Sequence, residues 1–357
     1  MKQSGKNYKR IVIKIGSSLL FGPEGAGGVS SYSLRELAGQ VAELVKEGRE
    51  VVIVSSGAIA FGMRILKMKS RPRQLHELQG LAAVGQHVLM EHYHRFFKKK
   101  GLHCAQVLLT WDDLANRKRC LNAKNTLLEL LRLKVVPIIN ENDTISSEEI
   151  KFGDNDKLSA LVASNLVSAE LLIILSDVEG LLDRSKKVVR IVDAITPQIR
   201  KLACPTNKAA CVGGMITKLD AAKIAVDSGI PCVIANGRSK DIILSAVNEP
   251  QEAGTFFVPS KSLTERQRWL AFGSRPKGKV YVDEGARRAL VDKKSLLSVG
   301  VVNREGNFER GDIVSLIDSQ GKEFARGKAG VSSKHLDKVK GRRSEKEVIH
   351  CDNIVIL

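Results

Sequence analysis

The sequence lacks the cysteine patterns of disulfide-stabilised and zinc-binding proteins. No two of its six cysteines form a CxxC pair, and none has metal-like Cys/His spacing. In a chain of 357 residues, they are expected to be reduced and mostly buried thiols. No apolar run approaches the roughly 20 residues that span a bilayer. The basic N-terminus leads straight into a strand pattern, without a signal-peptide apolar region. These absences predict a cytoplasmic protein with no membrane segment.

Two common nucleotide-binding signatures are also missing. The chain has no Walker A loop, and no GxGxxG motif follows a predicted strand, which disfavours a P-loop nucleotidase and a Rossmann dehydrogenase. Low-complexity tracts are absent too, and the composition, 43% hydrophobic and 27% charged, is typical of a globular protein. The length suits one large domain with a smaller one, or two of similar size.

The formal net charge of +18 is spread along the chain rather than gathered in one arm. General basic character is therefore favoured over a nucleic-acid footprint, although a nucleic-acid partner stays open. Small phosphate-rich substrates are also attracted by a positive field.

Short β-branched runs alternate with helical patterns along the first two thirds of the chain. The apolar runs at 10–16 and 50–57 each end in glycine, and further runs occupy 104–110, 135–140, 170–177 and 231–237. Strands that are apolar on both faces and alternate with helices predict a mainly parallel sheet, covered on both sides as a three-layer αβα sandwich. From Arg275 onward, short alternating runs with glycine turns predict a small β-rich domain.

Polar residues follow the predicted strands, at the edge where such sheets bind ligands. Gly16 and Gly57 directly follow the first two strands, where backbone N–H groups can meet an anion; a tight turn is the alternative. Ser176 and Asp177 end the fifth strand. A polar cluster of seven amide or carboxylate residues stands in two groups at the ends of a seventeen-residue stretch after the fourth strand: Asn140, Glu141, Asn142, Asp143, Asp154, Asn155 and Asp156.

That cluster is larger than helix caps and turns require, although capping is the alternative interpretation. It would suit binding an ammonium group, holding a lysine, or orienting Mg²⁺ through water. Gly213 and Gly214 open a helix whose N-terminus suits phosphate, and Lys218 lies one turn in. With Lys14 at the end of the first strand, Lys218 could neutralise a transferring phosphoryl group; a solvated helix lysine is the alternative.

In this order, the segments IVIKIGSSLL, VVIVSSGAIAFG, LAAVGQHVLM, NENDTISSEEIKFGDNDKLSALVA, LLIILSDVEGL and GGMITKLDAAKIAVDSGI resemble the amino acid kinase family, and within it the members that act on glutamate. The resemblance covers essentially the whole chain, with the kinase part at 1–270 and a segment similar to a PUA domain at 275–357. It implies ATP-dependent phosphorylation of the γ-carboxylate of L-glutamate to L-glutamyl 5-phosphate with Mg²⁺, the first step of proline biosynthesis. It also implies feedback inhibition by proline and a homo-oligomer, either a dimer or a tetramer.

The same resemblance implies roles for single residues. Lys14 and Lys218 would bind the ATP phosphates and stabilise the transition state, and Asp156 would organise both lysines. Glutamate would be bound by Ser56, Asp143 and Asn155, supported by Asn140 and Asp154. The nucleotide would be held by Ser176, Asp177, Val212, Gly213, Gly214, Met215, Ile216, Thr217 and Lys218. Gly16 and Gly57 would lend backbone N–H groups to the phosphoryl group.

Two departures from the family pattern leave the nucleotide preference open. Val212 stands where members commonly have threonine, and the short segment after Asp177 lacks the usual YxxDPR pattern. Among substrates, aspartate or N-acetylglutamate is the closest alternative, and the NEND…GDND pair argues against it. RNA binding by the PUA segment is a further alternative, disfavoured because that segment lacks interleaved aromatics for base stacking. The intervening TISSEEIKF is expected to be a mobile loop over the glutamate site.

Overall fold

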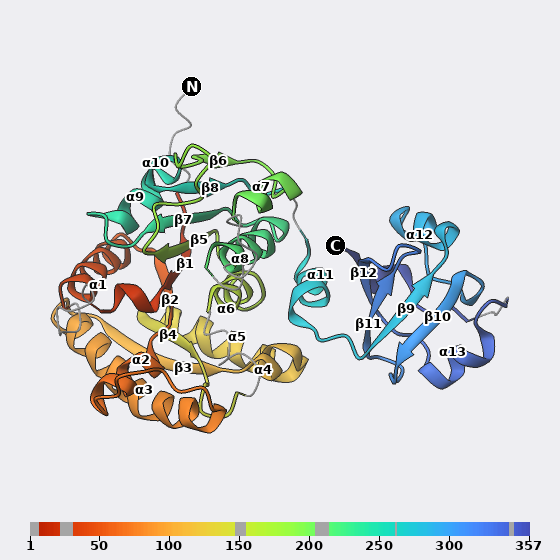
Figure 1. Ribbon diagram of the computed structural model, residues 1–357, viewed down its shortest axis with the longest axis horizontal. Helices are drawn as coiled ribbons and strands as arrows, with labels where there is room; N and C mark the ends of the chain where they lie inside the picture. The colour runs from red at the N-terminus through yellow and green to blue at the C-terminus, as the bar shows by residue number, and fades with distance from the viewer. Residues whose placement is uncertain (1–6, 22–30, 147–154, 204–213, 261–262, 343–345) are drawn as a thin grey trace. The chain divides into compact units, whose positions relative to one another are not determined.

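A computed structural model of the chain describes residues 7–21, 31–146, 155–203, 214–260, 263–342 and 346–357. The chain divides into two compact units, Met1–Ser262 and Leu263–Leu357 (Figure 1). Within the described ranges, no helix combines the length and the hydrophobicity that crossing a membrane requires.

The first unit is built on an eight-stranded sheet with the order β3-β4-β2-β1-β5-β7-β8-β6. Its strands are β1 (Arg10–Ile15), β2 (Glu50–Ser55), β3 (His103–Leu109), β4 (Val135–Glu141), β5 (Leu171–Ser176), β6 (Ile191–Val192), β7 (Cys232–Asn236) and β8 (Thr255–Phe257). Neighbouring strands pair in parallel except β7 with β8, which confirms the predicted mainly parallel sheet. The sequence did not predict β6 and β8, because strands of two and three residues are too short to show a pattern.

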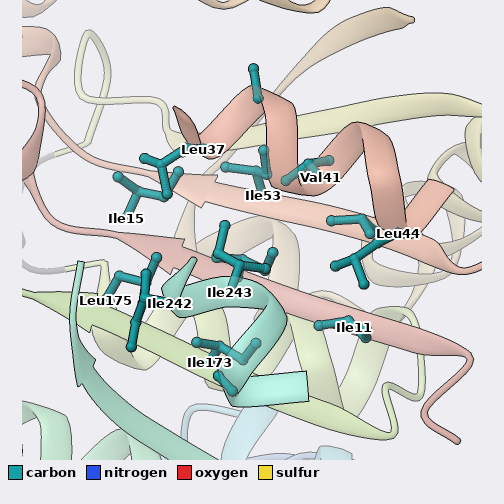
Figure 2. Close-up of a cluster of buried hydrophobic side chains, with 14 of the residues drawn as sticks. Ile11, Ile15, Leu37, Val41, Leu44, Ile53, Ile173, Leu175, Ile242 and Ile243 are labelled. Atoms are coloured by element: carbon teal, nitrogen blue, oxygen red, sulfur yellow. The ribbon is translucent and has the colours of Figure 1, made fainter. Parts of the chain in front are cut away.

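One face of this sheet is covered by α1 (Ser31–Lys46), α3 (Leu75–Lys98) and α9 (Ile242–Asn248). Side chains alternate between the faces of a strand, so Ile11, Ile13 and Ile15 of β1 all point toward these helices. Figure 2 shows α1 and α9 lying over β1, β2 and β5 with their apolar side chains interleaved. This cluster is the larger hydrophobic core.

The opposite face is covered by α5 (Arg117–Arg132), α6 (Asp156–Leu161) and α8 (Met215–Asp227), with α6 continuing as a π-helical turn over Val162–Leu166 (Figure 1). Alternation along β1 turns Lys14 toward this side, where the lysine is buried. The remaining helices of the unit are α2 (Ala58–Ile65), α4 (Trp111–Ala115), α7 (Pro197–Leu202) and α10 (Pro250–Ala253).

Helices α2 and α3 pack unusually closely, because glycines lie at their crossing. A Cβ added at Gly62 would come within 2.0 Å of the Leu81 carbonyl oxygen, and one at Gly85 within 1.8 Å of the Ala58 carbonyl oxygen. Only glycine therefore fits at either position. This crossing fixes the start of α2, which lies at the carboxyl edge of the sheet.

The second unit is a five-stranded sheet with the order β10-β9-β11-β12-β13. Its strands are β9 (Gly278–Val282), β10 (Val301–Gly306), β11 (Ile313–Ile317), β12 (Glu323–Lys328) and β13 (Ile354–Ile356), and its helices are α11 (Glu265–Arg268), α12 (Glu284–Val291) and α13 (Ser333–Val339). It has its own core, which includes Val280, Phe308 and Leu316. The predicted β-rich C-terminal part is confirmed.

Candidate active site

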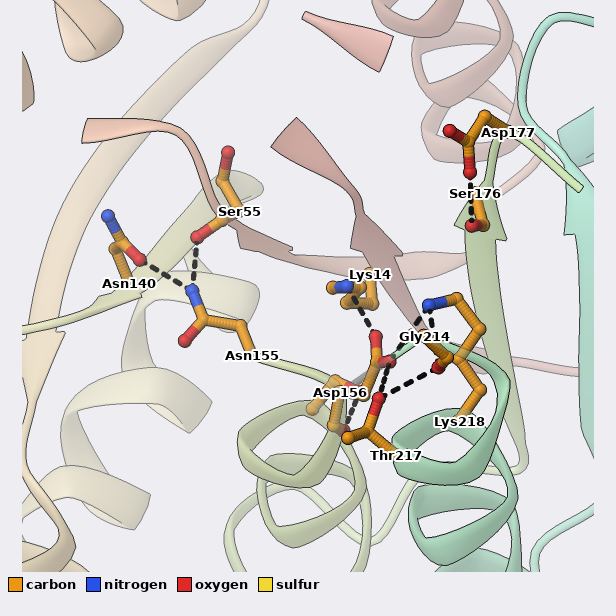
Figure 3. A network of polar contacts seen from close by, with 11 residues as sticks. Lys14, Ser55, Asn140, Asn155, Asp156, Ser176, Asp177, Gly214, Thr217 and Lys218 are labelled. Atoms are coloured by element: carbon orange, nitrogen blue, oxygen red, sulfur yellow. Dashed lines mark hydrogen bonds and ion pairs between the residues drawn. The ribbon is translucent and has the colours of Figure 1, made fainter. Parts of the chain in front are cut away.

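The predicted polar residues gather at the carboxyl edge of the first sheet, in three adjoining groups (Figure 3). Strands β1, β2, β4 and β5 run parallel, so their ends meet at this edge. In Figure 3, an amide group lies beside the end of β2, a lysine and carboxylate group lies below β1, and a serine and aspartate pair lies at the end of β5.

Two buried lysines share one buried carboxylate at the centre of the site. Asp156 is the first residue of α6 and is fully buried. Its Oδ1 forms an ion pair with Lys14 Nζ, and its Oδ2 lies 3.3 Å from Lys218 Nζ. Lys14 and Lys218 are only 4% and 8% exposed. Of the groups that these two ion pairs join, two are cations and one is an anion, and such an excess of buried positive charge favours an anionic ligand.

The first turn of α8 completes this centre. Thr217 Oγ1 lies 3.1 Å from Asp156 Oδ2 and 2.9 Å from the Gly214 carbonyl oxygen, and Lys218 Nζ donates to the same carbonyl at 3.2 Å. Gly214 has φ 77°, in the left-handed region where glycine is favoured. The glycine thus allows the chain to turn so that Thr217 and Lys218 both reach Asp156.

A chain of amides lies on the other side of Asp156. Asn155 Nδ2 donates to the Ser55 carbonyl oxygen at 2.7 Å and to Asn140 Oδ1 at 2.6 Å. Asn140 Nδ2 donates in turn to Gln86 Oε1 of α3 at 2.7 Å. Asn155 occupies the N-cap position of α6, yet its side chain makes no capping bond. Capping therefore does not explain this residue, whose amide instead joins β2 to β4.

The amides form one wall of a pocket at this edge. The pocket is lined by Ser17, Ser56, Gly57, Ala58, Ile59, Ala60, Arg71, Asn140, Glu141, Asp143 and Asn155. The Ser56 hydroxyl is buried and has no hydrogen-bond partner among the described residues. Gly57 has φ 109° and precedes α2, so the positive end of that helix faces the pocket. These groups offer donors to a carboxylate or a phosphoryl oxygen.

Two carboxylates and one guanidinium supply the charges of the pocket. Burial and the nearby Glu141 carboxylate raise the pKa of Asp143 to about 7, against the opposing effect of Arg71. Glu141 is buried and accepts a hydrogen bond from Ser146 Oγ at 2.5 Å. A ligand ammonium beside Asp143 would favour its ionised form.

Several predicted contributions are engaged within the protein or lie outside the described residues. The Gly16 N–H donates to the Leu175 carbonyl oxygen at 3.1 Å, because the β1–β5 hydrogen bonding continues one residue beyond β1. This hydrogen bond occupies the N–H that the sequence analysis assigns to a phosphoryl group, and that assignment stays a prediction. Asp154, Val212 and Gly213 lie outside the described residues, as does most of TISSEEIKF.

On the side of β5, Ser176 Oγ donates to Asp177 Oδ1 at 3.1 Å. Ser176 is buried, whereas Asp177 is exposed beyond the strand end. Met215 and Ile216, in the first turn of α8, are half-buried. Ser176 and Asp177 lie on the side of the lysine centre away from the amides (Figure 3).

Comparison with known proteins identifies the family of this site. Residues 9–236 match the model of the amino acid kinase family, and residues 278–351 match that of the PUA domain. The chain belongs to the amino acid kinase family. It is 42% identical to the glutamate 5-kinase of Thermoanaerobacter sp. (strain X514), over 98% of each chain. It is 44% identical to that of Citrifermentans bemidjiense over 100% of each, and 45% identical to that of Methylococcus capsulatus over 98% of this chain and 97% of the relative.

Within this amino acid kinase, several residues that line the pocket or support its wall were not assigned from the sequence. Gln86 and Tyr93 belong to α3, and Tyr93 OH lies 2.9 Å from Ser55 Oγ. A glutamine among the apolar positions of a helix is the signal that could have pointed to Gln86. Arg71 lies in the segment between α2 and α3, in a run of several basic residues that contains no distinguishing pattern.

Proposed function

We propose that this amino acid kinase transfers the γ-phosphoryl group of ATP to the γ-carboxylate of L-glutamate, giving L-glutamyl 5-phosphate and ADP. The observation that carries the proposal is the position of two consecutive residues. Asn155 belongs to the wall of a pocket suited to an amino acid, and Asp156 binds both lysines of an anion-binding centre. An amino acid in the pocket would thus have a carboxylate beside the position of a phosphoryl group.

In the proposed reaction, an oxygen of the γ-carboxylate attacks the γ-phosphorus, and the bond to the β,γ-bridging oxygen breaks as ADP leaves. Lys14 and Lys218 would balance the negative charge on the phosphoryl oxygens. Asp156 holds the two ammonium groups in place before the substrates arrive. The start of α2 would orient the attacking carboxylate through backbone N–H groups. No covalent intermediate with the protein is needed.

The charges in the pocket favour glutamate over N-acetylglutamate. Asp143 and Glu141 can accept hydrogen bonds from an ammonium group, which glutamate has and N-acetylglutamate lacks. An N-acetyl group would leave the buried Glu141 and the half-buried Asp143 without an ammonium partner from the ligand, which is costly. Aspartate is one methylene shorter, so its side-chain carboxylate would not reach the start of α2 while its ammonium stays at Asp143.

For the nucleotide, we propose binding between Ser176 and Asp177 at the end of β5 and the first turn of α8, through residues up to Lys218. The free N–H groups of a helix N-terminus suit ATP phosphates. Mg²⁺ would lower the charge repulsion between these phosphates and the attacking carboxylate. Since Asp156 is already engaged by two lysines, Mg²⁺ would be held mainly by the phosphates and water, as is common for this ion.

Further proposals concern regulation and setting. L-Proline has the same adjacent ammonium and carboxylate as glutamate, so it is the feedback inhibitor that we expect to compete for the pocket. We propose proline biosynthesis as the pathway, the cytoplasm as the location because ATP is available there, and a dimer or tetramer as the assembly. The proposed domain limits are 1–270 for the kinase and 275–357 for the PUA domain, for which RNA binding is the less favoured role.

The test is an assay of ADP release with L-glutamate, L-aspartate and N-acetyl-L-glutamate, each with and without proline, together with hydroxylamine to trap an acyl phosphate. Of the three substrates, we expect only glutamate to give a hydroxamate, and we expect proline to reduce the amount that forms. Turnover of aspartate or N-acetylglutamate in preference to glutamate would overturn the substrate assignment, and ADP release without hydroxamate would overturn the acceptor group.

A further inference from the structure

Arg71 is the one cation among the described residues that line the amino-acid pocket. The other charged lining residues are Glu141 and Asp143, and the remaining polar ones are neutral serines and asparagines. Arg71 is an exposed residue of the segment 66–74, whose two ends are held together where α2 and α3 meet closely at Gly62 and Gly85. Pro72 follows directly and restricts the backbone of Arg71 to extended conformations.

The charges of the proposed substrate must be divided among these groups. Glutamate has one ammonium and two carboxylates. The γ-carboxylate has to face the lysine centre and the start of α2, since the phosphoryl group arrives there. The ammonium suits Asp143 and Glu141. This leaves the α-carboxylate, which is bonded to the same carbon as the ammonium and so needs a partner next to Asp143.

Arg71 meets that requirement. It lines the pocket together with Asp143. Its positive charge acts on the Asp143 carboxylate and partly offsets the rise in the pKa of that group. A guanidinium can bind a carboxylate through two parallel N–H groups, which specifies the orientation of the ligand as well as its charge. We propose that Arg71 binds the α-carboxylate of the amino-acid substrate and makes this kinase selective for acids that have that group.

This inference rests on the proposed function and concerns which part of the substrate is recognised. It is tested with isoglutamine, the glutamate analogue in which an uncharged amide replaces the α-carboxylate while the ammonium and the γ-carboxylate remain. The variants are Arg71→Gln and Arg71→Lys, and the control is Arg73→Gln, which changes an exposed arginine two positions away that does not line the pocket.

For Arg71→Gln we expect the KM for glutamate to rise by about tenfold to a hundredfold, as for loss of a charged hydrogen-bonding partner. The KM for isoglutamine and the KM for ATP should stay near those of the unchanged protein, so the preference for glutamate should fall by the same factor. Arg71→Lys should give an intermediate preference for glutamate over isoglutamine, because lysine keeps the positive charge but lacks the two parallel N–H groups of the guanidinium. Arg73→Gln should leave the preference unchanged.

Equal losses with glutamate and isoglutamine in Arg71→Gln would mean that Arg71 only supports the fold, and would overturn the inference. Binding is measured separately, as the shift in Tm that each compound produces without ATP. Failure of the unchanged protein to phosphorylate glutamate would overturn the proposed function. In that case a larger Tm shift from glutamate than from isoglutamine, equalised by Arg71→Gln, would still support the role of Arg71, and equal shifts in the unchanged protein would refute it.

Discussion

Asn155 Nδ2 donates to Asn140 Oδ1 at 2.6 Å. The two ends of the polar cluster, which are fifteen residues apart in the sequence, therefore meet directly in space. The next residue, Asp156, faces the opposite way and pairs with Lys14 and Lys218. The N-terminus of α6 therefore joins the pocket wall to the lysine centre. A shift of α6 would disturb both, which links binding of the acceptor to stabilisation of the phosphoryl group.

Replacing Lys218 with alanine should remove one of the two positive charges that stabilise the transition state. We expect kcat to fall by about a hundredfold to a thousandfold, the scale for losing one preorganised electrostatic contact, with little change in the KM for glutamate. The control is Lys223→Ala, which removes a partly exposed lysine on the same helix, paired with Asp227. Steady-state kinetics check the result, and near-normal kcat in Lys218→Ala would contradict the proposed mechanism.

Asp156→Asn should lower stability as well as activity. The change leaves two buried lysines without their shared counterion, and breaking a buried ion pair on one side costs about 3–5 kcal/mol. Urea unfolding should show this loss, with kcat reduced in parallel. Asp220→Asn removes a half-exposed partner of Arg200 and should cost less than about 1 kcal/mol. If the two variants unfold at similar urea concentrations, Asp156 does not hold the lysines as described.

The fold was largely predictable because strands that are apolar on both faces and separated by helices have few stable arrangements. The polar residues at the ends of β1, β2, β4 and β5 followed from the same logic, since ends of parallel strands share one edge. What the sequence could not provide were contacts set by packing between distant segments. Arg71 lines the pocket from the irregular segment between α2 and α3, where no sequence pattern indicates it. Likewise, the Gly16 N–H donates to the Leu175 carbonyl oxygen because β5 continues beside it.

The raised pKa of Asp143 predicts a specific pH dependence of substrate binding. Near pH 7 the free enzyme holds part of its Asp143 as the neutral acid, whereas an ammonium ligand requires the carboxylate. The KM for glutamate should therefore rise as the pH falls below about 7, by up to about tenfold per pH unit. Asp143→Asn should have a high KM that varies little over this range. A pH-independent KM in the unchanged protein would contradict an ammonium contact at Asp143.

Asp143 should affect the stability of the fold in the opposite direction: lower pH weakens substrate binding but stabilises the folded protein. The pKa of Asp143 in the folded protein, about 7, lies above its usual value of 3.8, so between these pH values the folded state binds more protons than the unfolded state. The contribution of Asp143 to stability is thus present at low pH and is lost as the pH rises toward about 7. In the absence of substrate, Asp143→Asn should remove this decline, and urea unfolding at several pH values measures it. Identical pH profiles for the two proteins would contradict the raised pKa.

The crossing of α2 and α3 can be tested with two glycines of one helix. Gly85→Ala would place a Cβ 1.8 Å from the Ala58 carbonyl oxygen, whereas Gly80→Ala would meet nothing within 4 Å. Gly85→Ala should force the helices apart, cost about 1–3 kcal/mol, and raise the KM for glutamate because the start of α2 and Arg71 move. Gly80→Ala should be stabilising by up to about 1 kcal/mol, through helix propensity alone. Because both changes add one methyl group to α3, equal stabilities would show that the crossing is looser than described and that it does not position the pocket.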